Sequence, residues 1–211
     1  MRNVDQLIPL KYADSDLPES WVFAGGNPEV KVPISFVIYL LKVGERRILV
    51  DAGCETMPGF DMRGFISPAE ALARAGVEAH EITDVIITHA HSDHIQAVFR
   101  FPQAVVHIQQ DEYEKGRKYI PEGMQVLIFE QETLVADAIR AVRIGGHSVG
   151  SCVAEFWIDG QPCVICGDEC YSSACFDRMI PTGSTKNPEK SLAFLYAYKD
   201  GYRRFLCHDP I

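Results

Sequence analysis

The stretch Val85-Ile86-Ile87-Thr88-His89-Ala90-His91-Ser92-Asp93-His94 joins a short apolar run to a dense group of metal-ligand side chains. The apolar run predicts a buried strand. Side chains alternate along an extended segment, so His89 and His91 project to the same side. Asp93 and His94 follow where the chain is expected to turn into a helix, and they can reach a second point nearby. Three imidazoles and a carboxylate within six residues therefore indicate two adjacent metal ions rather than one.

The composition is that of one globular unit. The 211 residues are 47% hydrophobic and 23% charged, which allows one sizeable core and argues against disorder. We therefore expect a single domain over residues 1–211. The N-terminal residues have no apolar signal segment, and the longest apolar stretch, residues 34–41, is far shorter than the roughly 20 residues that span a bilayer. These features predict a cytoplasmic protein with no membrane partner.

The charge distribution argues against a nucleic-acid partner. The net charge is -9, and basic residues form only short pairs such as Arg46-Arg47. Binding to a phosphate backbone depends on clustered lysine and arginine. Small anionic substrates stay compatible with this chain because bound metal ions can dominate the local charge.

The seven cysteines are predicted to be free thiols. An odd number without an export signal does not suit a disulfide framework. Cys170 and Cys207 adjoin predicted metal ligands and are expected to pack as small hydrophobic side chains. Tuning of the metals, or sensing of oxidation, is the alternative for these two.

Apolar patterning predicts a strand-rich chain with a few helices, arranged as two sheets covered by helices. Residues 14–33 are rich in Pro, Gly, Asp and Ser and are predicted to be a long surface connection. Helices are expected after the N-caps Ser67 and Asn187. A turn is predicted at residues 131–133. Strands are predicted at residues 4–11, 34–42, 46–50, 84–88, 104–108, 126–129, 134–144, 153–158, 162–166 and 204–207.

Metal-ligand residue types follow four of the predicted strands. Beyond the cluster at His89, a Gly-Gly turn leads from one strand to His147, a second strand ends just before Asp168, and the last ends just before His208. Loops at one end of a sheet are where a rigid scaffold places a site. His107 falls inside a strand and is expected to be a surface histidine or a core histidine with a hydrogen-bond partner.

The donor types predict a catalytic pair of divalent ions, zinc first, with iron or manganese possible. A structural zinc site is the alternative, but such sites are closed, cysteine-rich and four-coordinate. Two ions about 3.5–4 Å apart make a hydroxide available as a nucleophile at neutral pH. One ion is expected to bind His89, His91 and His147, and the other Asp93, His94 and His208, with Asp168 bridging.

This ligand pattern resembles the metallo-β-lactamase superfamily of dinuclear hydrolases. The motif is His89-x-His91-x-Asp93-His94, followed in order by His147, Asp168 and His208 and preceded by Asp51-x-Gly53. The match runs over nearly the whole chain. It implies an α+β fold, the four-layer αββα sandwich, with the metal site at one edge of the two packed sheets. Asp51 is expected behind the ligands, where it would orient a histidine ring or the ligand loop.

Within that superfamily the chain is most similar to the N-acyl homoserine lactone hydrolases. Their signature tyrosine follows the bridging aspartate by three residues, as in Asp168-Glu169-Cys170-Tyr171. The resemblance implies that a metal-bridging hydroxide opens a lactone or related ester. Tyr171 would donate a hydrogen bond to the substrate carbonyl, and Asp93 would relay a proton to the leaving alkoxide. Phe60 and Phe65 are candidates for an acyl pocket.

Other activities on the same fold remain alternatives. Ser151 stands where the lactone hydrolases commonly carry a second histidine, and the loop at residues 54–67 is short. Another small-molecule esterase or thioesterase would use the same ligands. A mononuclear-iron sulfur dioxygenase would use only part of them, and a binding protein would need none of their chemistry. The expected partner is a small-molecule ester or lactone, and the sequence predicts no oligomeric state.

Overall fold

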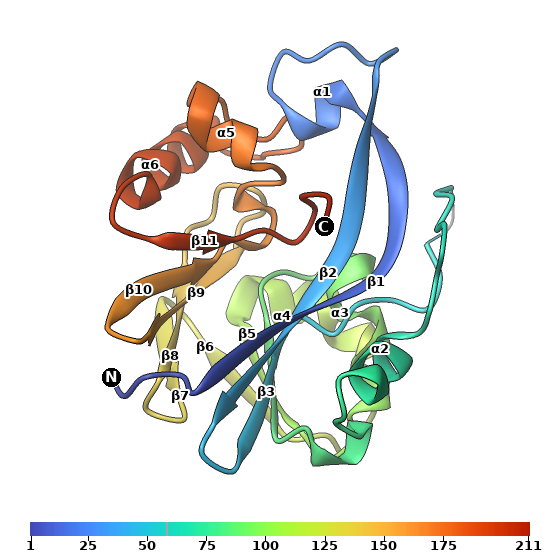
Figure 1. Cartoon of the computed structure of the whole chain (residues 1–211), viewed down its shortest axis with the longest axis vertical. Coiled ribbons are helices and arrows are strands. Elements are labelled where there is room, and N and C mark those ends of the chain that lie inside the picture. Colours follow the sequence, from blue (N-terminus) through green and yellow to red (C-terminus); the bar gives the residue numbers. More distant parts are fainter. Residues whose placement is uncertain (58) are drawn as a thin grey trace.

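The computed structural model describes residues 1–57 and 59–211. Their strands form two sheets that pack face to face, with helices on the outer faces (Figure 1). The strand order is β1-β2-β3-β4-β5-β6 in the first sheet and β11-β10-β9-β8-β7 in the second. The predicted αββα sandwich is confirmed.

The first sheet contains β1 (Gln6–Pro18), β2 (Lys31–Val43), β3 (Arg46–Val50), β4 (Asp84–Ile87), β5 (Val105–Gln109) and β6 (Val126–Phe129). The second contains β7 (Glu132–Val135), β8 (Ile139–Arg143), β9 (Cys152–Ile158), β10 (Gln161–Ile165) and β11 (Arg203–Phe205). The α-helices are α1 (Glu19–Val22), α2 (Pro68–Arg74), α3 (Ser92–Ile95), α4 (Gln110–Gly116), α5 (Ser173–Arg178) and α6 (Pro188–Tyr198). The 3-10 helices are η1 (Ala79–Glu81), η2 (Gln96–Arg100), η3 (Arg117–Tyr119) and η4 (Gly167–Glu169).

Alternating side chains along the strands separate the core into layers. Val50 and Ile86 of the first sheet belong to one buried cluster with Ala154 of the second, and this cluster fills the space between the sheets. Val85, the neighbour of Ile86, points the other way and belongs to the cluster that contains Leu72 of α2. Burial on both faces explains why the central strands are almost continuously apolar.

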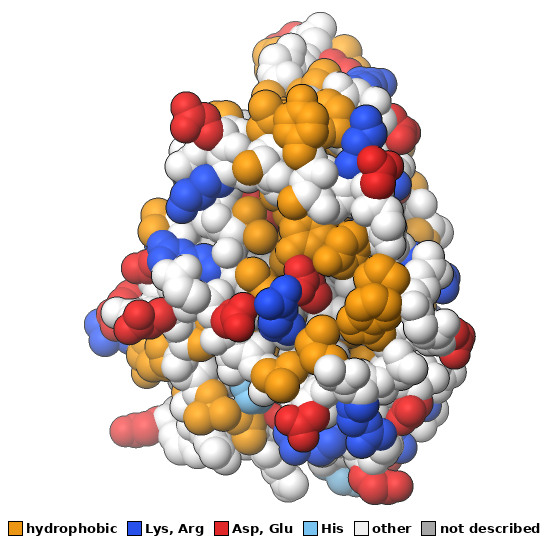
Figure 2. Space-filling model, turned by 90° about the vertical axis from the view of Figure 1, so that its left-hand side faces the viewer, with side chains coloured by type: hydrophobic (Ala, Val, Ile, Leu, Met, Phe, Trp, Pro, Cys, Tyr) orange, Lys and Arg blue, Asp and Glu red, His pale blue; other side chains and the backbone are white. Residues whose placement is uncertain are grey.

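The outer face of the second sheet is only partly covered. α6 packs on it, and the Tyr198 hydroxyl of this helix donates to Glu155 of β9. On this side of the molecule hydrophobic side chains gather in patches around charged ones (Figure 2). Leu134 and Trp157 of the second sheet are exposed. Among the described residues, no helix is long and apolar enough to cross a membrane.

The surface connection predicted at residues 14–33 is wrong for most of its length. β1 continues to Pro18 and stays paired with β2, which begins at Lys31. Across this ladder the Ser35 hydroxyl donates to the Asp14 carboxylate at 2.7 Å. The polar composition suggested a loop, but main-chain pairing does not depend on side-chain type, and this part of β1 still buries Leu17.

The single strand predicted at residues 134–144 is a hairpin instead. β7 and β8 flank a turn at Ala136 and Asp137, where φ is 53° and 52°. The register pairs Val135 with Ile139, so three residues link the strands, and the first two of them have positive φ. Neither position is a glycine, so the turn carried little sequence signal. The turn predicted at residues 131–133 is also wrong, because β7 begins at Glu132.

The other hairpins and the helix starts follow the prediction. β9 and β10 pair around Asp159 and Gly160, where both φ angles are positive. The Ser67 hydroxyl accepts from the Glu70 amide at 3.1 Å at the start of α2. At the start of α6, the Asn187 side chain accepts from the Lys190 amide in the same way. Local capping chemistry therefore sets these boundaries.

Candidate metal centre

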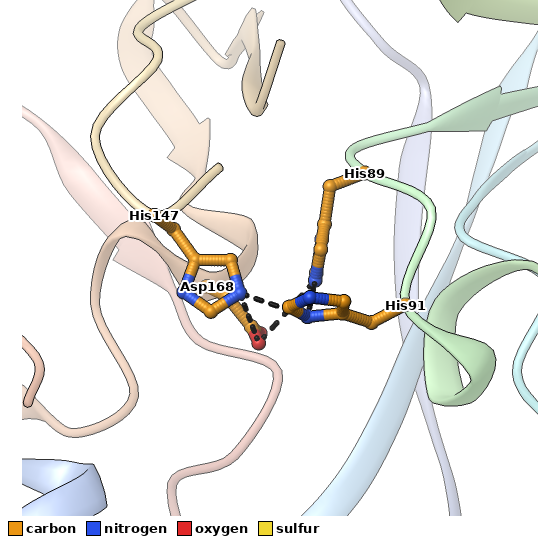
Figure 3. Close-up of side chains that lie close together, drawn as sticks. All are labelled: His89, His91, His147 and Asp168. Atoms are coloured by element: carbon orange, nitrogen blue, oxygen red, sulfur yellow. Dashed lines mark hydrogen bonds and ion pairs between the residues drawn. The ribbon is translucent and has the colours of Figure 1, made fainter. Parts of the chain in front are cut away.

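Three histidine nitrogens and one carboxylate oxygen converge where the loops after β4, β8 and β10 meet (Figure 3). His91 Nδ1 lies 2.9 Å from His89 Nε2 and 3.0 Å from His147 Nε2. Asp168 Oδ2 lies 3.5 Å from His89 Nε2 and 3.4 Å from His147 Nε2. Donors about 2 Å from one tetrahedral zinc ion lie roughly 3.3 Å apart. The spacing of this first ligand set fits one ion.

A second ligand set lies on the other side of Asp168. Asp168 Oδ1 is 3.0 Å from His94 Nε2 and 3.1 Å from His208 Nε2. Asp93 Oδ2 is 3.5 Å and 3.6 Å from the same two nitrogens. Asp168 therefore faces one set with each carboxylate oxygen, as a bridging ligand does.

Unpaired polar atoms support the presence of a cation between these groups. Among the described residues, His94 Nε2 and Asp168 Oδ1 are buried and have no hydrogen-bond partner. Such atoms are rare in folded proteins, because leaving one unpaired costs about 1–3 kcal/mol. A divalent ion would satisfy both, and imidazole with carboxylate is a donor set that suits zinc, iron or manganese. The residues present fit two divalent ions.

The protonation states within the cluster favour metal binding for part of the set. Burial alone would raise the pKa of Asp168, but the facing rings of His94 and His208 outweigh burial and hold that pKa well below its ordinary value. Burial lowers the pKa of His147 well below its ordinary value, and burial with the nearby His89 lowers the pKa of His91 to about 4. An ionised carboxylate and neutral imidazoles are the forms that ligate metals.

His94 and His208 behave in the opposite way. Burial would lower the pKa of each ring, but the negative charge of Asp168 outweighs burial and raises the pKa of both. These two rings compete for protons with a metal ion, so binding at the second set should release protons.

Asp51 lies directly behind His94. It follows the end of β3, and its Oδ2 accepts from His94 Nδ1 at 2.7 Å. Its Oδ1 accepts from the Thr88 amide at 2.8 Å, which ties it to the end of β4. With Nδ1 occupied in this way, Nε2 of His94 is left to face the metal site.

Glu169 supports the His147 loop, and the sequence did not reveal it. Its buried carboxylate accepts from the Gly146 amide at 3.0 Å, the His147 amide at 3.2 Å and the Ser151 hydroxyl. Burial raises the pKa of Glu169 in spite of these hydrogen bonds. Ser151, which departs from the lactone hydrolase pattern, therefore braces a ligand loop. A charged residue next to Asp168 in a buried stretch was the available signal.

Glu112 joins two ligand loops and was also missed. From α4, its buried carboxylate accepts from the Ala90 amide at 2.9 Å, the Gly150 amide at 2.9 Å and the Ser148 hydroxyl at 2.8 Å. Burial acts against ionisation, but the hydrogen bonds from Ala90, Lys115 and Ser148, together with the charge of Lys115, outweigh it and lower the pKa of Glu112 to about 2. Its position in a polar helix carried no signal of this role.

Tyr171 lies over the second ligand set. Its ring centroid is 4.9 Å from that of His208, and its hydroxyl accepts a hydrogen bond from Ser184 at 3.0 Å. Burial first, and then the charge of Asp168, raise the pKa of Tyr171 well above its ordinary value. The phenol therefore stays protonated and can act as a donor.

A cavity of about 270 Å³ opens beside the metal ligands and is lined mainly by apolar side chains. Phe60 lines it, next to Trp21, with ring centroids 5.9 Å apart. Phe65 is exposed and is not among the described residues that line the cavity, so its placement does not support the predicted acyl contact. Pro58, in the loop at residues 54–67, lies outside the described residues.

The remaining candidates take structural places. Cys170 and Cys207 are buried, and burial raises the pKa of both thiols, which fits the prediction that they pack as small hydrophobic side chains. His107 lies in β5 and contacts Asp84 Oδ1 at 2.9 Å, as expected for a core histidine.

Comparison with known proteins places this geometry in a family. The sequence pattern of the metallo-beta-lactamase superfamily matches residues 36–183. Over 78 residues the chain is 44% identical to metallo-beta-lactamase domain-containing protein 1 of Rattus norvegicus. That match covers 37% of this chain and 30% of the rat protein, so it spans less than a third of the relative's length.

Solved structures share the whole fold. An N-acyl homoserine lactone hydrolase, with N-hexanoyl-L-homoserine bound at its catalytic metal centre, has a TM-score of 0.86 at 21% identity, covering 99% of this chain and 94% of that one. A dizinc quorum-quenching lactonase in complex with its product has a TM-score of 0.78 at 19% identity, covering 99% and 90%. At these identities the likeness concerns the fold. The sequence match over residues 36–183 shows that the chain belongs to the metallo-beta-lactamase superfamily.

Proposed function

We propose that this protein is a dinuclear hydrolase that opens a lactone, with N-acyl homoserine lactones as the first substrates to test. The observation that carries the proposal is the position of Asp168. Its two oxygens face two separate ligand sets at 3.0–3.5 Å, which suits a bridge between two ions. Zinc is the ion that we expect, because the set is rich in imidazole.

The reaction that we propose divides the work between the ions and the chain. When bound, two such ions would supply a hydroxide at neutral pH and polarise the ester carbonyl. Tyr171, protonated and facing the cluster, donates a hydrogen bond to the carbonyl oxygen as negative charge develops there. Asp93 lies at the mouth of the second ligand set and relays a proton to the leaving alkoxide.

The cavity supports an ester with an apolar acyl group. Leu17, Phe36 and Phe60 line it together with Tyr171 and the ligands. Solved structures with the same fold include lactone hydrolases that hold acyl-homoserine products. A different small-molecule ester would meet the same apolar wall, so the lactone is the finer part of the proposal.

The test is turnover of a panel of N-acyl homoserine lactones by zinc-loaded protein, followed by proton release. We expect about two ions per chain and measurable opening of at least one lactone. Tyr171→Phe should lower kcat about tenfold with little change in KM, because the hydroxyl acts mainly in the transition state. Tyr196→Phe removes a hydroxyl from an exposed tyrosine and should leave kcat unchanged.

Two outcomes would contradict the proposal. Failure of metal-loaded protein to open any lactone in the panel would remove the lactonase assignment. One iron per chain with oxygen uptake would point to the dioxygenase alternative and would overturn the dinuclear hydrolase.

A further inference from the structure

We propose that Ser184 is a positioning residue that holds Tyr171 as a hydrogen-bond donor toward the metal cluster. This inference rests on the proposed function, in which Tyr171 contacts the substrate carbonyl. Ser184 Oγ donates to the Tyr171 hydroxyl at 3.0 Å. Both residues line the cavity beside Asp168 and His208, so this hydrogen bond lies at the wall of the reaction site.

The direction of this hydrogen bond decides what Tyr171 can do. A phenol has one hydrogen to give and can also accept. Because Ser184 donates, the phenolic oxygen accepts on that side, and its own hydrogen is available on the side of the cluster. If the bond ran the other way, Tyr171 would spend its hydrogen on Ser184 and could not donate to a substrate.

Thr182 ties the Ser184 segment to α1. Its hydroxyl donates to the Trp21 carbonyl oxygen at 3.0 Å, and its Oγ1 lies 3.1 Å from Ser184 Oγ. The same carbonyl accepts from the amides of Gly183 at 3.0 Å and Ser184 at 3.2 Å. These hydrogen bonds hold Ser184 beside Tyr171.

The segment that carries Ser184 is fixed against α1. The Ala24 amide donates to the Pro181 carbonyl at 2.9 Å, beside the two amide bonds to Trp21. Gly183 lies so close to this helix that a Cβ there would be 1.8 Å from the Ser20 carbonyl oxygen. These main-chain contacts should keep the Ser184 hydroxyl in place when a neighbouring side chain is changed.

Trp21 of α1 also forms part of the cavity wall that would contact the substrate. The Trp21 side chain lines the cavity, while its carbonyl anchors the Ser184 segment. The wall that would contact the acyl group and the hydroxyl that orients Tyr171 thus share one support. This arrangement distinguishes Ser184 from a serine that only stabilises the fold.

A double-mutant cycle tests the inference with the lactone that the zinc-loaded protein opens fastest. Ser184→Ala should lower kcat about threefold to tenfold, the range expected for one lost hydrogen bond, with KM changed less than twofold. In a Tyr171→Phe background, Ser184→Ala should not lower kcat further, because the phenol hydroxyl through which Ser184 acts has been removed. Ser184→Thr keeps the hydroxyl and should restore kcat to within about twofold.

A second readout does not depend on turnover. In protein labelled with 13C at the tyrosine Cζ, the Tyr171 resonance is identified by its absence in Tyr171→Phe. This resonance reports the hydrogen bonding of the phenol, and it should move in Ser184→Ala but return in Ser184→Thr. Ser173→Ala, the same change at an exposed serine two residues from Tyr171, should move neither the resonance nor kcat.

The outcomes separate this inference from the function on which it rests. If the wild-type protein opens no lactone, the proposed function fails, while the resonance still tests the contact. If the wild type is active and Ser184→Ala lowers kcat equally with and without the Tyr171 hydroxyl, Ser184 acts through the fold and the positioning role is wrong. An unmoved Tyr171 resonance in Ser184→Ala would overturn the inference directly.

Discussion

Asp51 combines a left-handed backbone with a carboxylate that orients a ligand. Its φ is 64°, a region that few residues other than glycine adopt, with Asn and Asp the usual exceptions. The side chain is buried and joins His94 to the end of β4. A residue at this position must therefore tolerate the backbone and also accept from the imidazole.

Asp51→Asn should weaken the second metal site while leaving the fold intact. Asparagine tolerates the same backbone conformation, but its amide is a poorer partner for His94 Nδ1 than a carboxylate. We expect a 10–100-fold loss of affinity for one of two ions, the usual effect of removing such a partner. Zinc titration by calorimetry measures it.

Asp137→Asn is the matched control for this prediction. Asp137 also has a positive φ, 52°, and it is exposed in the turn between β7 and β8. Asp137→Asn should leave the zinc affinities of both metal sites unchanged. Equal zinc affinities for the wild type and Asp51→Asn would show that Asp51 does not act through His94.

At the scale of the elements, β4 carries a charged anchor at its start and candidate metal ligands after its end. Asp84 begins β4 and is fully buried. It contacts His107 of β5 at 2.9 Å, accepts from Arg46 of β3 at 2.9 Å and accepts from Thr83 at 2.7 Å. The carboxylate therefore joins three adjacent strands, and it fixes the strand from which His89 follows.

This anchor predicts a loss of stability in acid. Burial would raise the pKa of Asp84, but the hydrogen bonds from His107, Arg46 and Thr83 outweigh it and lower that pKa to about 2. A lowered pKa stabilises the fold above the unfolded value near 4, and the contribution disappears as the pH falls through about 2. It amounts to about 2 kcal/mol, of which about half is lost by pH 3.

Urea unfolding of the wild type and Asp84→Asn at pH 5 and pH 3 measures this contribution. The free energy of unfolding should fall by about 1 kcal/mol more in the wild type, because asparagine has no proton to gain. Asp61→Asn, a change at an exposed carboxylate, should follow the wild type. If the free energy of unfolding of Asp84→Asn falls as much between pH 5 and pH 3 as that of the wild type, another group causes the loss.

For the molecule as a whole, the candidate metal centre lies between the two sheets and draws residues from both. His89 follows β4 of the first sheet, whereas His147, Asp168 and His208 follow strands of the second. Ions held by both groups would add to the apolar packing and the hydrogen bonds that already join the two halves of the sandwich.

Removal of metal should therefore lower the thermal stability strongly. An ion that binds only the folded chain, at a free concentration 1,000-fold above its Kd, stabilises it by about 4 kcal/mol. For a chain of this size such a change corresponds to a fall in Tm of about 10 °C. Scanning calorimetry with and without a chelator measures it.

Two histidine variants sharpen the measurement. His147→Gln removes a ligand and should reduce the response to chelator, whereas His80→Gln, at an exposed position in η1, should keep it. An unchanged Tm after complete removal of metal from the wild type would show that the ions do not stabilise the fold.

Local chemistry explains what could be predicted from the sequence. The identity and spacing of His89, His91, Asp93 and His94 depend on neighbouring residues and on ligand preferences, so the motif predicted both the fold family and two ligand sets. The strand ends before His147, Asp168 and His208 pointed to the same edge for the same reason. Capping at Ser67 and Asn187 was equally local, and it was confirmed.

Contacts between distant segments could not be predicted in this way. Glu112, Glu169 and Ser184 act on residues brought near only by the packing of two sheets, and their sequence surroundings are ordinary. β1 extends to Pro18 because β2 lies beside it, although its composition suggests a loop.

The sequence by itself determined the set of candidate metal ligands, because ligand type and spacing are properties of neighbouring residues. Only the tertiary structure decided which oxygen of Asp168 faces which candidate ligand set, which side chains line the cavity, and which hydroxyl donates to Tyr171. Those relations depend on distances of a few ångströms between strands and loops far apart in the chain, and sheet packing sets these distances.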